Sequence, residues 1–251
     1  MKFPIHKPVS VVGGMDMNSG LLTLITLFYC SDTDGYAKTP NIMPPFTSPP
    51  SSASQNPVSG LQEVKAGSFI FEKKNALPDF LCDDMIKRFE NNQADQYAGK
   101  VGATMNNMQS IKKTTDLVVS GKQHWQDADN NLFRSLGMAL NEFKQKFPYF
   151  SDMSRFQDMG YNLQRYQAGE YYHWHVDNDN LALASRQLVA LWYLNDAPEQ
   201  GGETEFMYQN IKVKPEKGKL VLFPPFWTHE HRAVMVGKGV KYIATTWITF
   251  R

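Results

Sequence analysis

The chain has 251 residues, a length that favours a single elaborated domain. Hydrophobic residues at 42% and aromatic residues at 13% suffice for a large core and exclude a wholly disordered chain. The 26 Lys and Arg residues balance 25 Asp and Glu residues, so no basic excess indicates a nucleic-acid partner. Two cysteines cannot form a disulfide framework, and the apolar run at 21–30 is too short to cross a membrane. We therefore predict a cytoplasmic protein that binds neither nucleic acid nor membrane.

The composition changes sharply near residue 61. Between Thr39 and Gly60 there is no charged residue, and six prolines lie among serines. Proline lacks a backbone donor and disfavours helix at the residue before it, so this stretch should be extended or disordered. We predict that residues 1–60 are an N-terminal tail with a Pro/Ser-rich linker and no assigned role. Residues 61–251 are then the folded domain.

Two helices are predicted within residues 77–150. Pro78 and Asp79 begin the first, and its apolar face is expected to carry Phe80, Leu81, Met85, Ile86 and Phe89. The second repeats apolar residues at steps of three or four, namely Leu132, Leu136, Leu140, Phe143 and Phe147. Asp127 or Asp129 is its expected N-cap, and Pro148 ends it. The polar stretch 100–115 between the helices is expected to be irregular.

From Met159 onward the pattern is typical of short strands. Branched and aromatic residues cluster in segments separated by Gly and Pro, at 161–166, 187–194, 204–207, 219–223, 232–236 and 242–250. A further short strand is expected at 69–71. Many short strands with helices gathered ahead of them predict a mainly β fold, a sandwich or jelly roll over 159–251 braced by the helices.

Four of the six histidines form two His-x-His pairs, His173/His175 and His229/His231. We predict that both pairs lie in strands, where residues two apart share a face and lie roughly 6.6 Å apart. Asp177 continues the face of His175. These two residues and one distal histidine can form a triad of two histidines and one carboxylate, which is typical of non-haem iron(II) oxygenases. A His-x-Asp sequence alone is common by chance, so the triad needs further support.

Longer motifs around the triad resemble the prolyl 4-hydroxylase family of 2-oxoglutarate- and iron(II)-dependent dioxygenases. Segment 165–177 (RYQAGEYYHWHVD) resembles the family's first metal-binding strand. The Tyr-Leu-Asn and Gly-Gly-Glu-Thr-x-Phe signatures are matched at 191–195 (LWYLN) and 201–206 (GGETEF). Leu-Phe-Pro at 222–224 and Gly-x-Lys-Tyr at 239–242 complete the pattern. The resemblance runs from about residue 77 to 251 and implies a double-stranded β-helix (jelly-roll) core braced by N-terminal α-helices.

This resemblance implies the roles of individual residues. His175, Asp177 and His231 match the iron ligands, because His231 and not His229 lies ten residues before Lys241. His173 would then be a neighbour of the metal site and not a ligand. Four further residues match positions that bind or line the co-substrate pocket, namely Tyr166, Tyr193, Thr204 and Trp247. For Tyr193 and Trp247, ordinary core packing is an equally good interpretation.

The resemblance further implies that Lys241 binds the far carboxylate of 2-oxoglutarate. The expected activity is hydroxylation of an unactivated C–H bond, with Fe(II) as cofactor, 2-oxoglutarate and O2 as co-substrates and ascorbate as a reductant. Asp177 favours hydroxylation, since halogenating relatives carry a small residue at this position.

The expected substrate is a prolyl residue of a peptide or protein, with a free amino acid or other small molecule as the alternative. A second alternative is a non-catalytic, cupin-like metal-binding domain. Lys241 and the Gly-Gly-Glu-Thr segment argue against it, because a bare metal site needs no buried receptor for a carboxylate. The sequence carries no signal for the oligomeric state.

Overall fold

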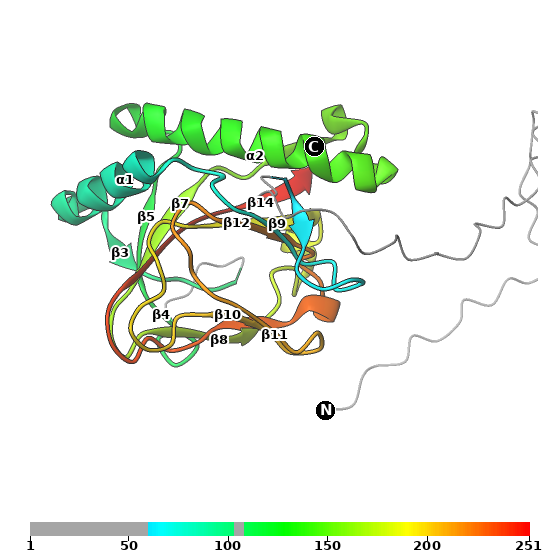
Figure 1. Ribbon diagram of the computed structural model, residues 1–251. Helices are drawn as coiled ribbons and strands as arrows, with labels where there is room; N and C mark the ends of the chain where they lie inside the picture. Colours follow the sequence, from blue (N-terminus) through cyan, green and yellow to red (C-terminus); the bar gives the residue numbers. More distant parts are fainter. Residues whose placement is uncertain (1–59, 103–107) are drawn as a thin grey trace, which may run out of the picture. The chain divides into compact units, whose positions relative to one another are not determined.

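The computed structural model describes residues 60–102 and 108–251, so the predicted tail lies, except for Gly60, outside the described residues. Two antiparallel sheets face each other, and two helices cover the outer face of the larger sheet (Figure 1). The predicted jelly-roll core braced by helices is therefore confirmed. Within the described ranges, no helix is long and apolar enough to cross a membrane.

The larger sheet has nine strands in the order β1-β2-β12-β9-β14-β7-β5-β3, with β6 beside β14. Their bounds are β1 Gln62–Glu63, β2 Phe71–Lys73, β3 Tyr97–Ala98, β5 Thr115–Val118, β6 Phe156–Asp158, β7 Asn162–Tyr166, β9 Arg186–Tyr193, β12 Leu220–Phe223 and β14 Lys241–Phe250. The smaller sheet has the order β11-β10-β13-β8-β4. Its strands are β4 Lys112–Lys113, β8 Tyr171–His175, β10 Thr204–Phe206, β11 Ile211–Val213 and β13 His231–Ala233.

Strand alternation divides the interior into two cores. On β9, Leu188, Ala190 and Trp192 belong to the cluster that contains the buried faces of the helices. The residues between them, Val189, Leu191 and Tyr193, belong to the cluster between the sheets. Successive side chains of a strand point to opposite faces, so a strand that is buried on both sides contributes to both cores. The inward-facing residues of β7, β9, β12 and β14 therefore surround the space between the sheets.

Helix α1 (Asp79–Asn91) begins where the sequence predicts, but its buried stripe differs. Cys82, Met85 and Phe89 are its buried residues, and Phe80 is 68% exposed. Residues three and four apart share a helix face, and Phe80 lies outside the stripe that Cys82 begins. The expectation that Phe80 contributes to the core is therefore wrong.

Helix α2 (Gln126–Lys146) lacks the predicted cap. Trp125 occupies the N-cap position without a side-chain cap hydrogen bond, because the 3-10 turn η2 (Gln123–Trp125) continues directly into the helix. Asp127 and Asp129 lie in the first turn instead, where a negative charge interacts favourably with the helix dipole.

The stretch 100–115 is more regular than predicted. It contains β4, and Thr115 begins β5, although positions 103–107 lie outside the described residues. β4 pairs with β8, and β5 pairs with β7. These polar residues form strands because β8 and β7, which are distant in sequence, offer backbone hydrogen-bond partners. Local composition does not show such partners. Strands β1, β3, β6 and β11 were likewise not predicted.

One hydrogen-bonded serine connects the larger sheet to α2. The Ser135 hydroxyl donates to the Ala76 carbonyl at 2.7 Å and accepts from Trp192 Nε1 at 2.9 Å. Ser135→Ala leaves the buried indole N–H without a partner, so we expect the free energy of unfolding to fall by about 1–3 kcal/mol. Urea denaturation measures this loss. Ser110→Ala, at an exposed position, is the matched control and should be neutral.

Candidate metal centre

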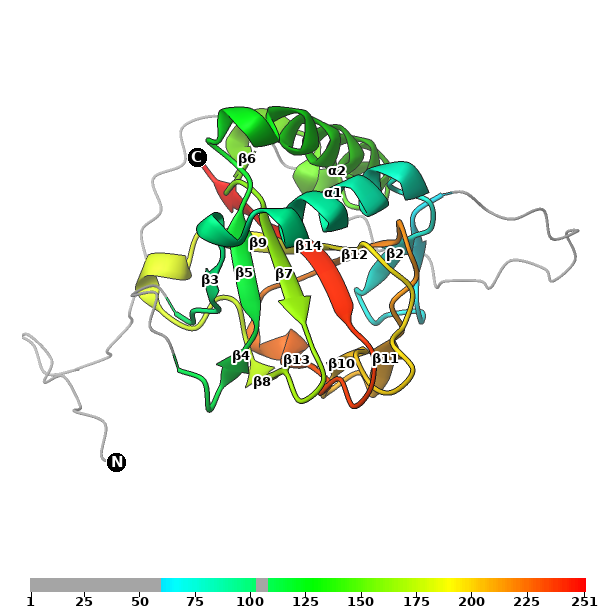
Figure 2. The same cartoon turned by 90° about the vertical axis from the view of Figure 1, so that its left-hand side faces the viewer.

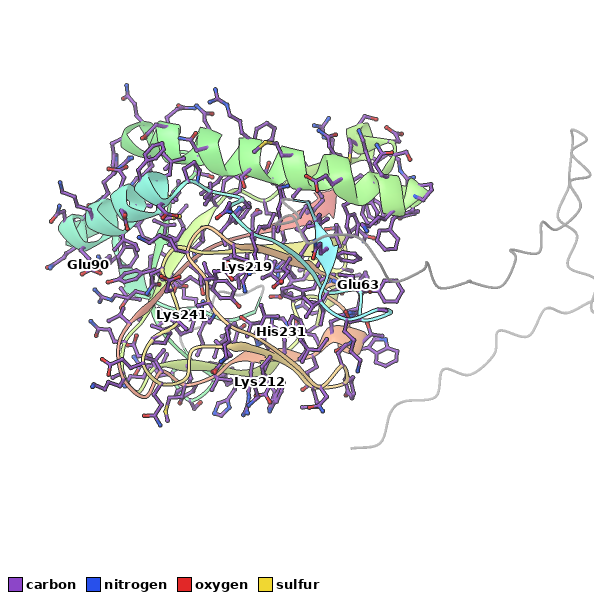
Figure 3. The ribbon with its side chains drawn as sticks, viewed as in Figure 1. Glu63, Glu90, Lys212, Lys219, His231 and Lys241 are labelled. Atoms are coloured by element: carbon purple, nitrogen blue, oxygen red, sulfur yellow. The ribbon has the colours of Figure 1, made fainter. Side chains whose placement is uncertain are left out.

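His175, Asp177 and His231 come together between the two sheets. His175 ends β8, Asp177 follows two residues later, and His231 begins β13 directly opposite His175 in the ladder. One ligand atom from each side chain lies within 4.8 Å of the other two, and His231 Nε2 is 3.4 Å from Asp177 Oδ2. Within the described part of the chain, this is the one group of three such residues that could hold a metal ion. In Figure 3, His231 lies between the two layers.

Both histidines are oriented by their own backbone. His175 Nδ1 donates to the His173 carbonyl at 2.7 Å, and His231 Nδ1 donates to the His229 carbonyl at 3.0 Å. A proton fixed on Nδ1 leaves the Nε2 lone pair available for a metal. Burial lowers the pKa of both imidazoles, which favours the neutral form that a ligand needs.

Asp177 is held through its main chain. Its N–H donates to the Pro225 carbonyl at 3.1 Å, and its own carbonyl accepts from Arg186 Nη1 at 2.8 Å. The residue is 8% exposed. These two contacts fix the position from which the carboxylate points toward the histidines.

The prediction that His229 lies in a strand is wrong. His229 ends the 3-10 turn η6 (Trp227–His229), and its Nε2 donates to the Ser68 carbonyl at 2.9 Å. The ring therefore holds the segment around Ser68, and His229 is not part of the group formed by His175, Asp177 and His231.

A bulge in β8 contradicts the simple alternation that places His173 and His175 on one face. His231 and Ala233, two residues apart, pair with His175 and Tyr172, which are three apart. The extra residue in β8 reverses the alternation there. His173 is consequently exposed, and Tyr172 joins His175 on the inner side. The two rings are stacked, with centroids 3.5 Å apart and planes 12° from parallel.

A small cavity of about 50 Å³ extends from the triad toward Lys241. Lys241 is 1% exposed, and its Nζ has no hydrogen-bond partner among the described residues. The ammonium lies 5.0 Å from the ring centroid of Tyr166 and 5.4 Å from that of Tyr193. Burial lowers the pKa of Lys241 to about 7. A buried cation that has no partner among the described residues and faces a cavity beside His175, Asp177 and His231 fits an anionic ligand.

Three of the four other predicted co-substrate residues line the same cavity, namely Tyr166, Thr204 and Trp247. Tyr193 is not among its lining residues, and its hydroxyl lies 2.7 Å from Thr204 Oγ1 and 3.2 Å from the Val213 carbonyl. Tyr193 therefore supports the wall of the cavity from behind.

A larger cleft of about 940 Å³ opens on the other side of the triad. His175, Asp177 and Trp247 belong to the walls of both spaces. Three buried donors on the cleft wall have no hydrogen-bond partner among the described residues, namely the Tyr161 hydroxyl, Arg186 Nε and Trp247 Nε1. The guanidinium of Arg186 lies 3.9 Å from the Trp247 ring centroid.

Among the wall residues that were not assigned to the site from sequence, Gln164, Tyr172 and Arg186 contact assigned residues. Gln164 lies two positions before Tyr166 on β7, and this spacing was an available signal for the inner face. Tyr172 gives no such signal, because the bulge alone turns it inward. Arg186 binds the Asp177 carbonyl and also lines the cleft.

Comparison with known proteins agrees with this geometry. Residues 161–249 match the model of the 2OG-Fe(II) oxygenase superfamily. This part of the chain is a 2OG-Fe(II) oxygenase domain. Members of this superfamily use Fe(II), 2-oxoglutarate and O2, so the match supports a 2-oxoglutarate-dependent dioxygenase. No curated protein matches the chain in sequence.

Solved prolyl hydroxylases share the oxygenase's fold. The viral collagen prolyl hydroxylase of Paramecium Bursaria Chlorella virus-1, in its 2OG complex, is 23% identical with a TM-score of 0.55, over 75% of this chain and 99% of that one. The Trichoplax adhaerens prolyl hydroxylase, in complex with a hypoxia inducible factor peptide fragment, is 16% identical with a TM-score of 0.61, over 73% and 84%. A Pseudomonas putida prolyl-4-hydroxylase is 18% identical with a TM-score of 0.56, over 74% and 95%.

The triad makes a prediction about metal affinity. His175→Ala, Asp177→Ala and His231→Ala each remove a donor atom, so each should weaken Fe(II) binding by at least about 100-fold, more than loss of an outer-shell partner does. Anaerobic calorimetric titration measures this affinity. His173→Ala changes an exposed neighbour and should bind as wild type. His229→Ala should lower the melting temperature and leave the affinity intact, and a larger effect at His229 than at His231 would contradict the assignment.

Proposed function

We propose that the oxygenase hydroxylates a prolyl residue of a peptide or protein, with His175, Asp177 and His231 holding Fe(II). Lys241 binds the distal carboxylate of 2-oxoglutarate in this proposal. The observation that carries it is the buried Lys241 ammonium, which has no hydrogen-bond partner among the described residues and faces the cavity that His175, Asp177 and His231 also line. An ammonium is a compact charge that suits a carboxylate in a narrow pocket. A non-catalytic metal-binding domain would give this cation no role.

When bound, the metal and its co-substrate supply the oxidising chemistry of the family. The chain's own residues would bind the metal and the co-substrate, orient them and exclude water from the pocket. The Nε2 atoms of His175 and His231 and the Asp177 carboxylate would hold the metal, since two histidines and one carboxylate are a donor set that suits Fe(II). Tyr166, Thr204 and the apolar inner face close the pocket around Lys241, which strengthens its attraction for a carboxylate. Ascorbate as a reductant stays a prediction from the resemblance.

The outer cleft supports a peptide substrate. In the part of the chain that the structure describes, Arg186 Nε and Trp247 Nε1 on the cleft wall have no hydrogen-bond partner. Peptide carbonyl oxygens are the acceptors that a polypeptide offers to such donors. The cleft of about 940 Å³ is at the upper end of the range for small-molecule sites, so it exceeds what a free amino acid requires. The related folds named above belong to prolyl hydroxylases, one of which holds a peptide fragment.

Lys241 gives the proposal a kinetic test. Lys241→Ala leaves a desolvated carboxylate unpaired, a loss of about 3–5 kcal/mol for a buried pair, so 2-oxoglutarate should bind roughly 100-fold more weakly or worse. Fe(II) affinity should change little. The visible absorption of the protein with Fe(II) and 2-oxoglutarate, titrated without oxygen, measures this effect. An unchanged 2-oxoglutarate dependence would remove Lys241 from the site.

The same lysine predicts a pH dependence. Burial lowers its pKa to about 7, and only the protonated ammonium attracts the carboxylate. Affinity for 2-oxoglutarate should therefore be constant below pH 7 and fall above it, by up to about tenfold per pH unit. Lys241→Arg carries a group that stays charged throughout this range, so its binding, even if weaker, should not vary with pH. A wild-type profile that is flat from pH 6 to 9 would contradict the assignment.

The substrate itself is tested with peptides. We expect proline-containing peptides to stimulate 2-oxoglutarate turnover and to gain one oxygen atom at proline, as read by tandem mass spectrometry. The same peptides with Ala in place of Pro are the matched control and should gain none. Oxygen transfer to free proline or another free amino acid, with every peptide inert, would favour the small-molecule alternative.

A further inference from the structure

A buried ion pair joins the two sheets at the open edge of the sandwich. Lys112 lies on β4 of the smaller sheet and Asp116 on β5 of the larger one, with Lys112 Nζ 2.7 Å from Asp116 Oδ2. The two side chains are 5% and 3% exposed. Figure 2 shows β4 below β5 at the same edge of the two layers. The pair fastens one sheet to the other on the wall of the outer cleft, which both residues line.

The surroundings leave the pair little freedom. Asp116 Oδ1 also accepts from Thr114 Oγ1 at 2.7 Å, and Asn162 Nδ2 lies 3.4 Å from Oδ2. The backbone of Gly99 packs against the same group, since a Cβ there would lie 2.0 Å from Thr114 Oγ1 and 3.0 Å from Lys112 Cε. The ion pair is therefore held in one geometry.

Stability alone is a weak reason for such a pair. Removing two charges from water cancels most of their attraction, and apolar residues of similar volume often replace a buried ion pair without loss of stability. A role in fixing the position of something nearby is better attested. The neighbours of Lys112 indicate what that is.

Lys112 faces the aromatic ring that covers a candidate metal ligand. Lys112 and Tyr172 are direct partners in the β4–β8 ladder, and Lys112 Nζ is 5.3 Å from the Tyr172 ring centroid. The same ring is stacked on His175 with centroids 3.5 Å apart. Contacts thus run without a break from Asp116 through Lys112 and Tyr172 to His175.

We propose that the Lys112–Asp116 pair is a positioning element of the metal centre, which fixes β4 to β5 and thereby holds Tyr172 against His175. The orientation of this imidazole toward the metal then depends on the pair. The inference deepens the proposed function and rests on it, since it takes His175 as a ligand. Neither Lys112 nor Asp116 contacts the metal or the co-substrate in this proposal.

The decisive variant replaces both charges. Lys112→Met alone leaves Asp116 buried without its cation and should lower the melting temperature by roughly 10 °C. Lys112→Met/Asp116→Leu removes that penalty and should melt near wild type. With Co(II) alone as the probe, we expect this folded double variant to bind about 10–100-fold more weakly than wild type and with an altered visible spectrum. A double variant that melts, binds and absorbs as wild type does would overturn the inference.

Two further variants complete the test. Lys217→Met breaks an ion pair with Asp83 (2.7 Å) outside the cleft lining and should leave Co(II) binding unchanged. Tyr172→Leu keeps the ion pair and should weaken Co(II) binding as much as the double variant does. Adding Tyr172→Leu to the double variant should not weaken Co(II) binding further. If the loss of Co(II) affinity in the triple variant equals the product of the losses in Tyr172→Leu and in the double variant, the inference is overturned. Wild-type Co(II) binding by Tyr172→Leu would also overturn it, even if the double variant fails to fold.

Failure of the proposed function is a different result. It would be seen in the wild-type protein, as Co(II) binding that is absent or insensitive to His175→Ala. A wild type that binds Co(II) through His175, beside variants at 112, 116 and 172 that bind equally well, contradicts only the positioning role.

Discussion

The candidate metal centre depends on one register, in which β8 pairs with β13 so that His175 lies opposite His231. Because the two histidines come from neighbouring strands of one sheet, the hydrogen-bond ladder sets the distance between them. The bulge beside this pair turns Tyr172 inward and His173 outward. Asp177 follows within two residues and is anchored by backbone contacts on both sides. Any slip of this register would move His231 away from His175 and Asp177.

Buried charges are used in two ways around this register. Lys112 is fully paired with Asp116 between the sheets, whereas Lys241 has no partner among the described residues. A buried cation that is paired fixes the structure around it. Burying an unpaired cation costs free energy unless an anionic ligand binds to it. The Lys112–Asp116 pair lies on the wall of the outer cleft, and Lys241 lies on the wall of the inner cavity. His175 and Asp177 line both spaces.

The two cores explain why the inner cavity can be polar without loss of the fold. The outer core lies between the larger sheet and the helices. It buries aromatic and aliphatic side chains of α1, α2 and strands β7, β9, β12 and β14. The same strands present their other face to the site. Alternate residues of the same strands therefore stabilise the fold and line the site. On β14, Ala244 and Ile248 face the helices, whereas Lys241, Ile243 and Trp247 face the cavity.

Local patterns in the sequence determined both helices, most strands of the jelly roll and the motifs that carry the candidate ligands and Lys241. Helical periodicity, strand alternation and motif spacing are properties of neighbouring residues, so they can be read without the fold. The predicted tail, the cytoplasmic location and the roles of the site residues stay predictions. Only the tertiary structure decided that His229 holds Ser68, that Tyr172 covers His175, and that Lys112 and Asp116 meet across two sheets. The direction of each of these side chains is set by a register, a bulge or a partner strand far away in the chain, and no local pattern carries that information.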